Sequence, residues 1–396
     1  MIMAMMKSSN TEWLGGIPAE WDVAQIGNYY ELRNEKVSDY DFEPLSVTMK
    51  GIVPQLATAA KSDDHSNRKL VKRGDFVINS RSDRRGSCGI SPLDGSVSLI
   101  NIVMEPRGEM NPQYYNWLFH TEQFADEFYK WGHGIVDDLW TTRWQEMKKI
   151  LIIAPSPDEQ QAIADYLDET CSKIDEIIAE AKASIDEYKE LKQSVIFEAV
   201  TKGLDKNVEM KDSGSYWIRD IPLTWSTIKT KYVIKIENGS DPSTEGDTPV
   251  YGSGANSFKT CGEYKVGPTV LLGRKGATLH IPHYIEGKYW NVDTAFNTTS
   301  IEKRINLKYF YYVAFCFDYT RYISQTTLPG MTQTSYKNIY IPYPPMNVQN
   351  RIVLWLDNKI DELDSLIAEK ESLINDLEAY KKSLIYEVVT GKRRVV

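Results

Sequence analysis

Two short basic segments contain the residue types best suited to binding a polyanion. Each ends an apolar run: Lys72-Arg-Gly-Asp-Phe-Val-Ile-Asn-Ser-Arg81 aligns with Lys265-Val-Gly-Pro-Thr-Val-Leu-Leu-Gly-Arg274, sharing a Lys, a Gly, a Val and the final Arg. The apolar runs predict strands that enter the basic loops Arg81-Ser-Asp-Arg-Arg-Gly86 and Arg274-Lys275-Gly276. An arginine at such a hairpin tip can enter the major groove of DNA and offer a bidentate fork to guanine. The candidate DNA contacts are Lys72, Arg81, Arg84, Arg85, Lys265, Arg274 and Lys275. The alternative is a pair of solvated β-turns.

A second polar loop precedes the last predicted strand of each half. It reads Leu139-Trp-Thr-Thr-Arg143 in the first half and Leu328-Pro-Gly-Met-Thr-Gln-Thr-Ser335 in the second. Hydroxyl, amide and guanidinium groups suit base edges and phosphates, although they also suit any surface loop. This loop adds the candidates Thr141, Thr142, Arg143, Thr332 and Gln333. The polar turn Tyr251-Gly-Ser-Gly-Ala-Asn256 is a less specific third segment.

Signatures of catalysis are absent from the sequence. There is no GxGxxG after a strand, no Asn-Pro-Pro-Tyr or Asp-Pro-Pro-Tyr box and no GxxxxGK[ST] phosphate loop. His280-Ile-Pro-His283 approaches metal-ligand spacing but lacks a Cys or carboxylate partner, so we interpret it as structural. We therefore predict no active site, no metal and no cofactor bound by this chain.

The elements that must position these loops form two mixed α/β (α+β) domains. In the first half, short apolar runs predict strands over 75–79 and 97–104 and a helix over 112–129. In the second half the corresponding patterns predict strands over 269–272, 280–284 and 295–301 and a helix over 307–319.

The chain also repeats itself. Residues 160–201 align without a gap on residues 349–390 at a shift of 189, and 15 of the 42 positions are identical. A second match opens each copy, where Trp13-Leu-Gly-Gly-Ile-Pro-Ala-Glu-Trp21 aligns with Trp217-Ile-Arg-Asp-Ile-Pro-Leu-Thr-Trp225 at a shift of 204. The stretch between these matches is therefore 15 residues longer in the first copy. This pattern indicates an internal pseudo-twofold repeat in which one scaffold carries two different domains.

The repeated segments read as two long helices. Apolar residues recur at heptad spacing after the proline-rich stops at 155–157 and 342–345, and about 42 helical residues rise roughly 60 Å. An antiparallel coiled-coil pair within the chain is the simplest layout, and an intermolecular coiled coil is the alternative. The predicted divisions are a domain at 1–157, a helix at 158–203, a second domain at 204–346 and a helix at 347–396.

Charge divides along the same lines. The net charge is −9, yet segments 158–200 and 347–390 together hold 21 acidic and nine basic residues. The remainder is mildly basic, which suits contact with phosphates but predicts that partner subunits supply much of the positive field. No run of 18 apolar residues or signal peptide is visible, and four widely spaced cysteines indicate a reduced, cytoplasmic protein.

Together these patterns resemble the specificity subunit of type I restriction-modification systems. The resemblance rests on the Trp…Ile-Pro…Trp openings, the variable domains, the junctions Ile150-Leu-Ile-Ile-Ala-Pro155 and Ile339-Tyr-Ile-Pro-Tyr-Pro344, the following Gln160 and Gln349, and the long heptad helices. It covers essentially the whole chain, twice. One departure is Val348 before Gln349, where family members often have Glu, as in Glu159-Gln160.

The resemblance implies a non-catalytic DNA specificity subunit. Two target-recognition domains would each read one half of a bipartite site in double-stranded DNA, with the paired helices setting the spacing. The partners it implies are two methyltransferase subunits and two restriction subunits, which would bring S-adenosylmethionine, ATP and Mg. No membrane is expected. The alternatives are a coiled-coil adaptor without DNA recognition and a single-chain transcription regulator, although no helix-turn-helix pattern is visible.

Overall fold

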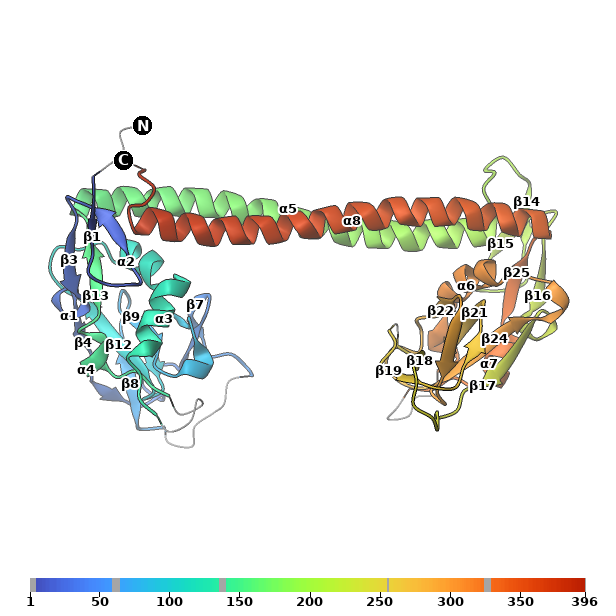
Figure 1. Ribbon diagram of the computed structural model, residues 1–396, viewed down its shortest axis with the longest axis horizontal. Coiled ribbons are helices and arrows are strands. Elements are labelled where there is room, and N and C mark those ends of the chain that lie inside the picture. Colours follow the sequence, from blue (N-terminus) through green and yellow to red (C-terminus); the bar gives the residue numbers. More distant parts are fainter. Residues whose placement is uncertain (1–4, 59–64, 135–139, 255, 324–328, 396) are drawn as a thin grey trace. The chain divides into compact units, whose positions relative to one another are not determined.

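The chain forms two units joined by two long helices (Figure 1). A computed structural model describes residues 5–58, 65–134, 140–254, 256–323 and 329–395. Unit 1 comprises Met1–Ala181 and Ser372–Val396, and unit 2 comprises Lys182–Glu371. Each unit therefore contains one globular part together with a portion of each long helix.

Helices α5 (Pro157–Lys202) and α8 (Met346–Val389) confirm the two predicted long helices. Their heptad positions are buried, including Ile163, Leu167 and Ile178 in α5 and Leu356 and Leu363 in α8. The pairing is antiparallel within each unit, because Lys381 bonds Asp175 at 2.6 Å in unit 1 and Lys192 bonds Asp364 at 2.7 Å in unit 2. These four residues belong to identical repeat pairs, so the two contacts are equivalent.

The ends of the long helices follow from local sequence. Ser156 and Glu159 form a capping box at the start of α5: the Ser156 amide donates to the Glu159 carboxylate and the Glu159 amide to the Ser156 hydroxyl, each at 3.4 Å. Gly203 follows α5 with φ +80°, and Gly391 lies just beyond α8 with φ +72°. Both take the left-handed conformation that terminates helices and favours glycine. The predicted C-terminal helix over 347–396 consequently ends at Val389.

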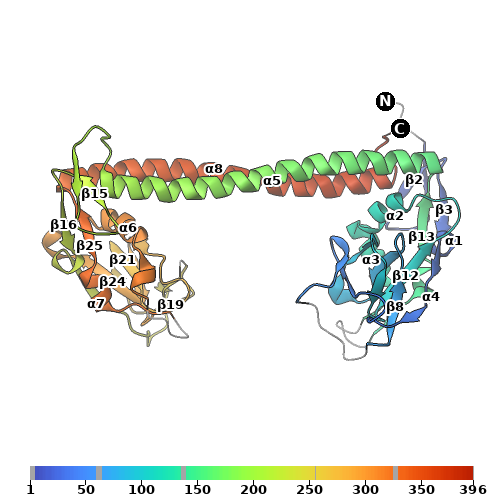
Figure 2. The same cartoon turned by 180° about the vertical axis from the view of Figure 1, so that it is seen from behind.

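Unit 1 is built on a four-stranded antiparallel sheet in the order β10-β9-β12-β4, with α2 and α3 packed beside it (Figures 1 and 2). A second sheet has the order β11-β8-β5, and β6 pairs with β7. The elements are β4 (Tyr30–Leu32), β5 (Lys36–Val37), β6 (Leu45–Thr48), β7 (Gly51–Pro54), β8 (Arg68–Val71), β9 (Phe76–Asn79), β10 (Cys88–Ile90), β11 (Gly95–Val97), β12 (Asn101–Pro106), α2 (Pro112–Phe119), α3 (Glu122–Lys130) and α4 (Trp144–Met147).

Two predicted elements of unit 1 are each divided in the structure. The strand predicted over 97–104 is two strands, because the chain turns at residues 98–100 between β11 and β12. The helix predicted over 112–129 is interrupted where Thr121 caps the N-terminus of α3 through its hydroxyl. Hydrophobic pattern alone misses both breaks, since the apolar residues continue across them.

Unit 2 repeats the main sheet in the order β17-β24-β21-β22, and its second sheet has the order β19-β18-β23-β20. The elements are β17 (Ile234–Asn238), β18 (Thr248–Tyr251), β19 (Lys259–Cys261), β20 (Lys265–Val266), β21 (Thr269–Gly273), β22 (His283–Ile285), β23 (Lys288–Asn291), β24 (Ala295–Ser300), α6 (Leu307–Phe315) and α7 (Gln333–Asn338). The predicted strand over 280–284 begins only at His283, and the predicted helix over 307–319 ends at Phe315.

Short strand pairs tie each globular part to the helices. In unit 1, β1 (Met6–Ser8) pairs with β2 (Gly16–Pro18), and β3 (Asp22–Gln25) pairs with β13 (Leu151–Ala154), which leads into α5. In unit 2, β14 (Met210–Asp212) pairs with β15 (Asp220–Pro222), and β16 (Ser226–Lys229) pairs with β25 (Tyr340–Tyr343), which leads into α8. The short helix α1 (Ile26–Tyr29) follows β3.

The repeated tryptophans are buried where each globular part meets the long helices. Trp21 and Trp225 are 2% and 5% exposed, and the unit 2 core joins Trp225 to Ile196 and Val200 near the end of α5. In unit 1 the Tyr386 hydroxyl of α8 donates to the Trp13 carbonyl at 2.8 Å. The Trp…Ile-Pro…Trp segments are therefore docking sites for the ends of the long helices.

Candidate nucleic-acid interface

Both predicted basic loops connect antiparallel strands. In unit 1, β9 pairs with β10 through Ile78 and Cys88, so residues 80–87 form the connection. In unit 2, β21 pairs with β22 through Leu271 and His283, so residues 274–282 form it. The hairpin geometry inferred from the sequence is confirmed in both copies.

The second candidate loop of each half pairs with the basic loop of the same half. In unit 1, the amide of Ser82 donates to the Trp140 carbonyl at 3.1 Å and that of Thr142 to the Ser80 carbonyl at 3.0 Å. In unit 2, the amide of Gly276 donates to the Pro329 carbonyl at 3.0 Å and that of Met331 to the Arg274 carbonyl at 2.9 Å. Segments about 60 residues apart thus meet in the same hydrogen-bond pattern twice.

This pattern corrects the alignment of the two basic loops. Arg81 pairs with Thr141 in unit 1, and it is Lys275, not Arg274, that pairs with Gly330 in the equivalent position of unit 2. The ladders of the main sheets agree, because Asn79 faces Asn101 and Gly273 faces Ala295. A gapless comparison misses this one-residue offset, whereas strand register is determined by backbone hydrogen bonds.

The arginines of the unit 1 loop are exposed but not free of partners. Arg84 has a 68% exposed side chain and lies 3.7 Å from Asp83, and Arg85 forms an ion pair with Asp126. Exposed ion pairs contribute only about 0–1 kcal/mol, so exchanging the carboxylate for a phosphate costs little. Arg81 is partly exposed, and its amide donates to Asn79 Oδ1 at 3.0 Å.

The basic side chains of the unit 2 loop gather around Asp293. The Arg274 guanidinium donates to the Asp293 carbonyl at 3.2 Å, and Lys275 lies 4.0 Å from the Asp293 carboxylate. Their side chains remain 36% and 45% exposed. Asp293 therefore orients both cations at the surface while leaving each partly open to solvent.

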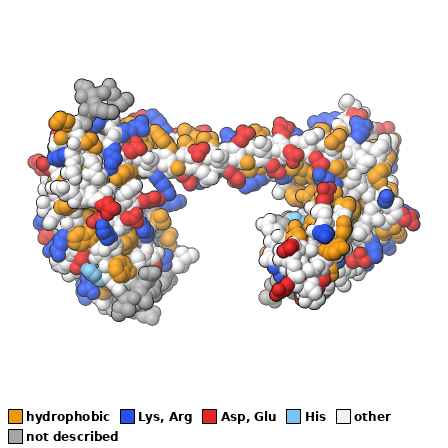
Figure 3. All heavy atoms as spheres, in the orientation of Figure 1, with side chains coloured by type: hydrophobic (Ala, Val, Ile, Leu, Met, Phe, Trp, Pro, Cys, Tyr) orange, Lys and Arg blue, Asp and Glu red, His pale blue; other side chains and the backbone are white. Residues whose placement is uncertain are grey.

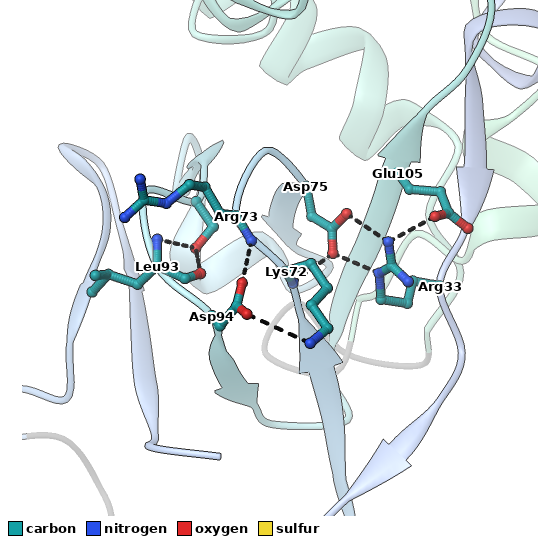
Figure 4. Close-up of polar contacts among 8 residues, drawn as sticks. Arg33, Lys72, Arg73, Asp75, Leu93, Asp94 and Glu105 are labelled. Carbon is teal, nitrogen blue, oxygen red and sulfur yellow. Dashed lines mark hydrogen bonds and ion pairs between the residues drawn. The ribbon is translucent and has the colours of Figure 1, made fainter.

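Lys72, in the turn between β8 and β9, belongs to a network of polar contacts (Figure 4). Its ammonium lies 3.5 Å from Asp94, and its amide donates to the buried Asp75 carboxylate at 2.8 Å. Arg33 bridges Asp75 and Glu105 at 2.7 Å each, and the hydrogen bond with Asp75 raises the Arg33 pKa. The Lys72 backbone is thus fixed by Asp75, while its side chain stays 42% exposed in a surface ion pair with Asp94.

Lys265 is also directed into its own unit. Its ammonium donates to Asn291 at 2.7 Å and Asn297 at 2.8 Å, and burial lowers its pKa. These contacts direct the partly buried Lys265 side chain onto β23 and β24 of its own unit.

Of the remaining candidate residues, some lie at the surface and others hold the loop backbone in place. Thr142 is fully buried and its hydroxyl donates to the Phe128 carbonyl at 2.7 Å, so it supports the loop from inside. Arg143 is exposed beside the partly exposed Thr141. In unit 2, exposed Thr332 caps α7 by accepting from the Ser335 amide, and Gln333 donates to Asn238 at 2.9 Å.

A third segment approaches the basic loop of unit 2. A Cβ on Gly276 would lie 3.2 Å from the Ser253 hydroxyl, and a Cβ on Gly254 would lie 3.9 Å from the Thr278 hydroxyl. The polar turn between β18 and β19 is thus adjacent to residues 276–278, which was not evident from its sequence. Residues 139, 255 and 328 of the three candidate loops lie outside the described part of the chain.

Two glutamines that are identical between the copies, Gln160 and Gln349, attach the domains to the long helices. Gln160 accepts from the Asn111 amide at 2.8 Å and donates to the Pro155 carbonyl at 2.8 Å. Gln349 makes the same pair of bonds, with Asn306 at 2.9 Å and Pro344 at 2.9 Å. Both side chains are 1% exposed. The identity of these two residues between the copies was the only sign in the sequence that they matter. Each one bonds its domain to the start of a long helix.

Within the described residues, no cluster of three or more His, Cys, Asp or Glu side chains could hold a metal ion. His283 is partly buried, and burial lowers its pKa, in keeping with a neutral structural imidazole. The four cysteines are unpaired thiols. No helix in the described ranges has the length and apolarity needed to cross a membrane.

Comparisons with known proteins agree with this architecture. Residues 222–376 match the family described as "Type I restriction modification DNA specificity domain". The chain is 25% identical over 255 residues to the type I restriction enzyme MjaVIII specificity subunit of Methanocaldococcus jannaschii, covering 60% of this chain and 55% of that relative. It is 21% identical to the putative MjaX specificity subunit of the same organism, covering 96% of each protein.

Two solved structures share the fold. A chain from a structure on complex assembly and conformational transition of the type I R-M system superposes with a TM-score of 0.76 at 14% identity, covering 95% of this chain and 99% of that one. The HsdS subunit of Thermoanaerobacter tengcongensis superposes with a TM-score of 0.56 at 15% identity, covering 98% and 100%. The two-domain arrangement with long connecting helices is therefore a known fold.

Proposed function

We propose that the chain is a specificity subunit of a type I restriction-modification system, and that its two domains each read one half of a bipartite site in double-stranded DNA. The observation that carries this proposal is the repeated junction of a basic hairpin loop with a second polar loop in both units. The backbone pattern is the same, while the side chains differ. A common frame with different contact groups suits two half-sites of different sequence.

The long helices would set the distance between the half-sites. Helix α5 has 46 residues, which corresponds to about 69 Å of α-helix. Paired helices of this length resist bending more than a flexible linker does, so their length determines which faces of DNA the domains meet. Successive major-groove faces on one side of B-DNA recur about every 34 Å.

The chain would act without chemistry of its own. We propose that two methyltransferase subunits, carrying S-adenosylmethionine, dock on the helices and that two restriction subunits, using ATP and Mg, join the complex in the cytoplasm. The exposed surfaces of α5 and α8 carry both acidic and basic side chains (Figure 3), which offers polar docking positions for such partners. Matches to specificity domains favour this function over an adaptor without DNA recognition.

The test is an adenine-methylation map of the host genome with and without this gene. We expect deletion to remove one motif made of two short blocks around a fixed gap, and complementation with the full chain to restore it. If a methyltransferase is expressed beside the gene and the map stays unchanged on deletion, the chain does not specify methylation.

A further inference from the structure

Each unit contains a second hairpin that faces the basic loop. In unit 1 it is β6–β7, where Thr48 pairs with Gly51 and the tip is Met49-Lys50. In unit 2 it is β18–β19, where Val250 pairs with Lys259. The first half of each hairpin makes a parallel pairing with a strand of the second sheet. In unit 1, Pro44, just before β6, pairs with Ser96 of β11. In unit 2, Val250 of β18 pairs with Trp290 of β23. The two hairpins are therefore equivalent, although their tips differ in length and composition.

Glycine contacts hold the unit 1 hairpin against the strand that follows the basic loop. A Cβ on Gly89 would lie 2.9 Å from the Gly51 Cα, so no larger residue fits at this crossing. Gly51 has φ +105°, a conformation that favours glycine after the tight turn. A Cβ on Gly86 would lie 3.9 Å from the Met49 methyl, which places the tip directly beside the basic loop.

A groove of about 580 Å³ separates the hairpin from the loop. One wall is formed by Ser46, Val47, Thr48 and Met49, and the other by Asn79, Asp83, Arg84, Arg85 and Ser87. Met49 is 71% exposed, and Lys50 next to it is exposed.

We propose that the DNA half-site read by unit 1 lies across the mouth of this groove, with Met49, which lines the groove, touching a base edge and Lys50, next to it at the hairpin tip, touching a backbone phosphate. This inference rests on the proposed function and adds a hairpin that the basic loops alone did not indicate. Apolar side chains discriminate thymine through its methyl group, whereas lysine pairs with phosphate as a point charge. The exposed ion pairs of Arg84 and Arg85 can open toward DNA, as argued above. Because the β18–β19 hairpin of unit 2 has a different tip sequence, it would offer different side chains to the other half-site.

The test compares two tip variants in the full chain, assembled with its methyltransferase subunits. We expect Lys50→Ala to weaken binding of a site-containing duplex and of a random duplex by a similar factor. It should also make the slope of log K against log salt less negative by about one. Met49→Ala should leave the salt slope unchanged and relax one position of a single half-site by roughly 5- to 150-fold in discrimination.

Matched controls are Lys36→Ala and Met6→Ala, which alter exposed residues of β5 and β1 in the same unit and outside the β6–β7 hairpin. Both should keep affinity, salt slope and motif. Lys50→Arg should restore the salt slope. Melting temperatures check that each variant is folded, which the exposure of both tip residues leads us to expect.

The inference is overturned if folded Met49→Ala and Lys50→Ala variants match the unmodified chain in affinity, salt slope and both half-sites. That result would leave the proposed function intact, provided that gene deletion still removes the bipartite motif. Failure of the deletion experiment would instead remove the proposed function itself.

Discussion

At the scale of single residues, the structure separates contact groups from support groups that look alike in sequence. The Lys265 ammonium donates to Asn291 within its own unit, and Thr142 is buried. Arg84 and Lys275 stay exposed at hairpin connections. Base recognition needs exposed side chains on a rigid backbone, so the exposed set carries the predictions about DNA.

Replacing Arg274 tests a base or phosphate contact in unit 2. We expect Arg274→Ala to cost about 1–3 kcal/mol of site binding and to relax one position of one half-site, because a bidentate fork is lost. Methylation mapping measures the relaxed base position, and duplex binding measures the loss of affinity. Arg304→Ala is the control, since Arg304 pairs with Glu302 on the surface and lies outside the candidate loops. An unchanged motif and affinity would remove the assignment of Arg274.

Replacing Gln160 tests the attachment of a domain to its helix. Gln160→Ala leaves the Asn111 amide and the Pro155 carbonyl without this partner, so we expect the free energy of unfolding to fall by about 1–3 kcal/mol. Gln161→Ala is the matched control, because the neighbouring Gln161 is exposed and bonds to the Asp165 and Asn111 side chains at the surface. Equal effects of the two changes in denaturant melts would contradict this role.

At the scale of elements, the two helix starts differ in one informative way. Glu159 completes the capping box of α5, accepts from the Trp21 indole at 3.2 Å and pairs with Arg394 at 3.3 Å. The equivalent residue in unit 2 is Val348, which packs against the core instead. At this one position, polar contacts hold the start of α5, whereas apolar packing holds the start of α8.

Glu159→Val should therefore lower the stability of unit 1. We expect a loss of about 1–2 kcal/mol in the free energy of unfolding, because the capping interaction and the indole acceptor disappear together. Glu159→Gln keeps an acceptor for both and should lose less. The comparison uses denaturant melts of the full chain, and a larger loss for Gln than for Val would refute the account.

At the scale of the whole molecule, the repeat predicts that spacing and sequence are separate properties. The candidate contact loops of the two domains differ in sequence, whereas α5 and α8 align without a gap and are identical at 15 of 42 positions. Changing the helices should therefore change only where the domains meet DNA.

Inserting one heptad into both helices tests this separation. A heptad adds about 10 Å to each helix and preserves the buried stripe, so the pairing should survive. We expect the methylated motif to keep both half-sites and to change its gap. Insertions of seven residues in only one helix serve as the control, because they break the register of the pair and should reduce stability. Altered half-site sequences in the double insertion would contradict the proposal that the helices set only the spacing.

Much of the architecture was determined by the sequence alone. Heptad periodicity, proline stops and an internal repeat specify long helices and two copies of one scaffold, because these signals are local and periodic. The basic hairpins were also predictable, since an apolar run entering a glycine-containing loop is a local pattern. Only the tertiary structure decided which loops meet, that Arg81 corresponds to Lys275, and that Lys265 turns inward. These features depend on backbone pairing and burial between segments distant along the chain, and such contacts leave no periodic trace in the residues that make them.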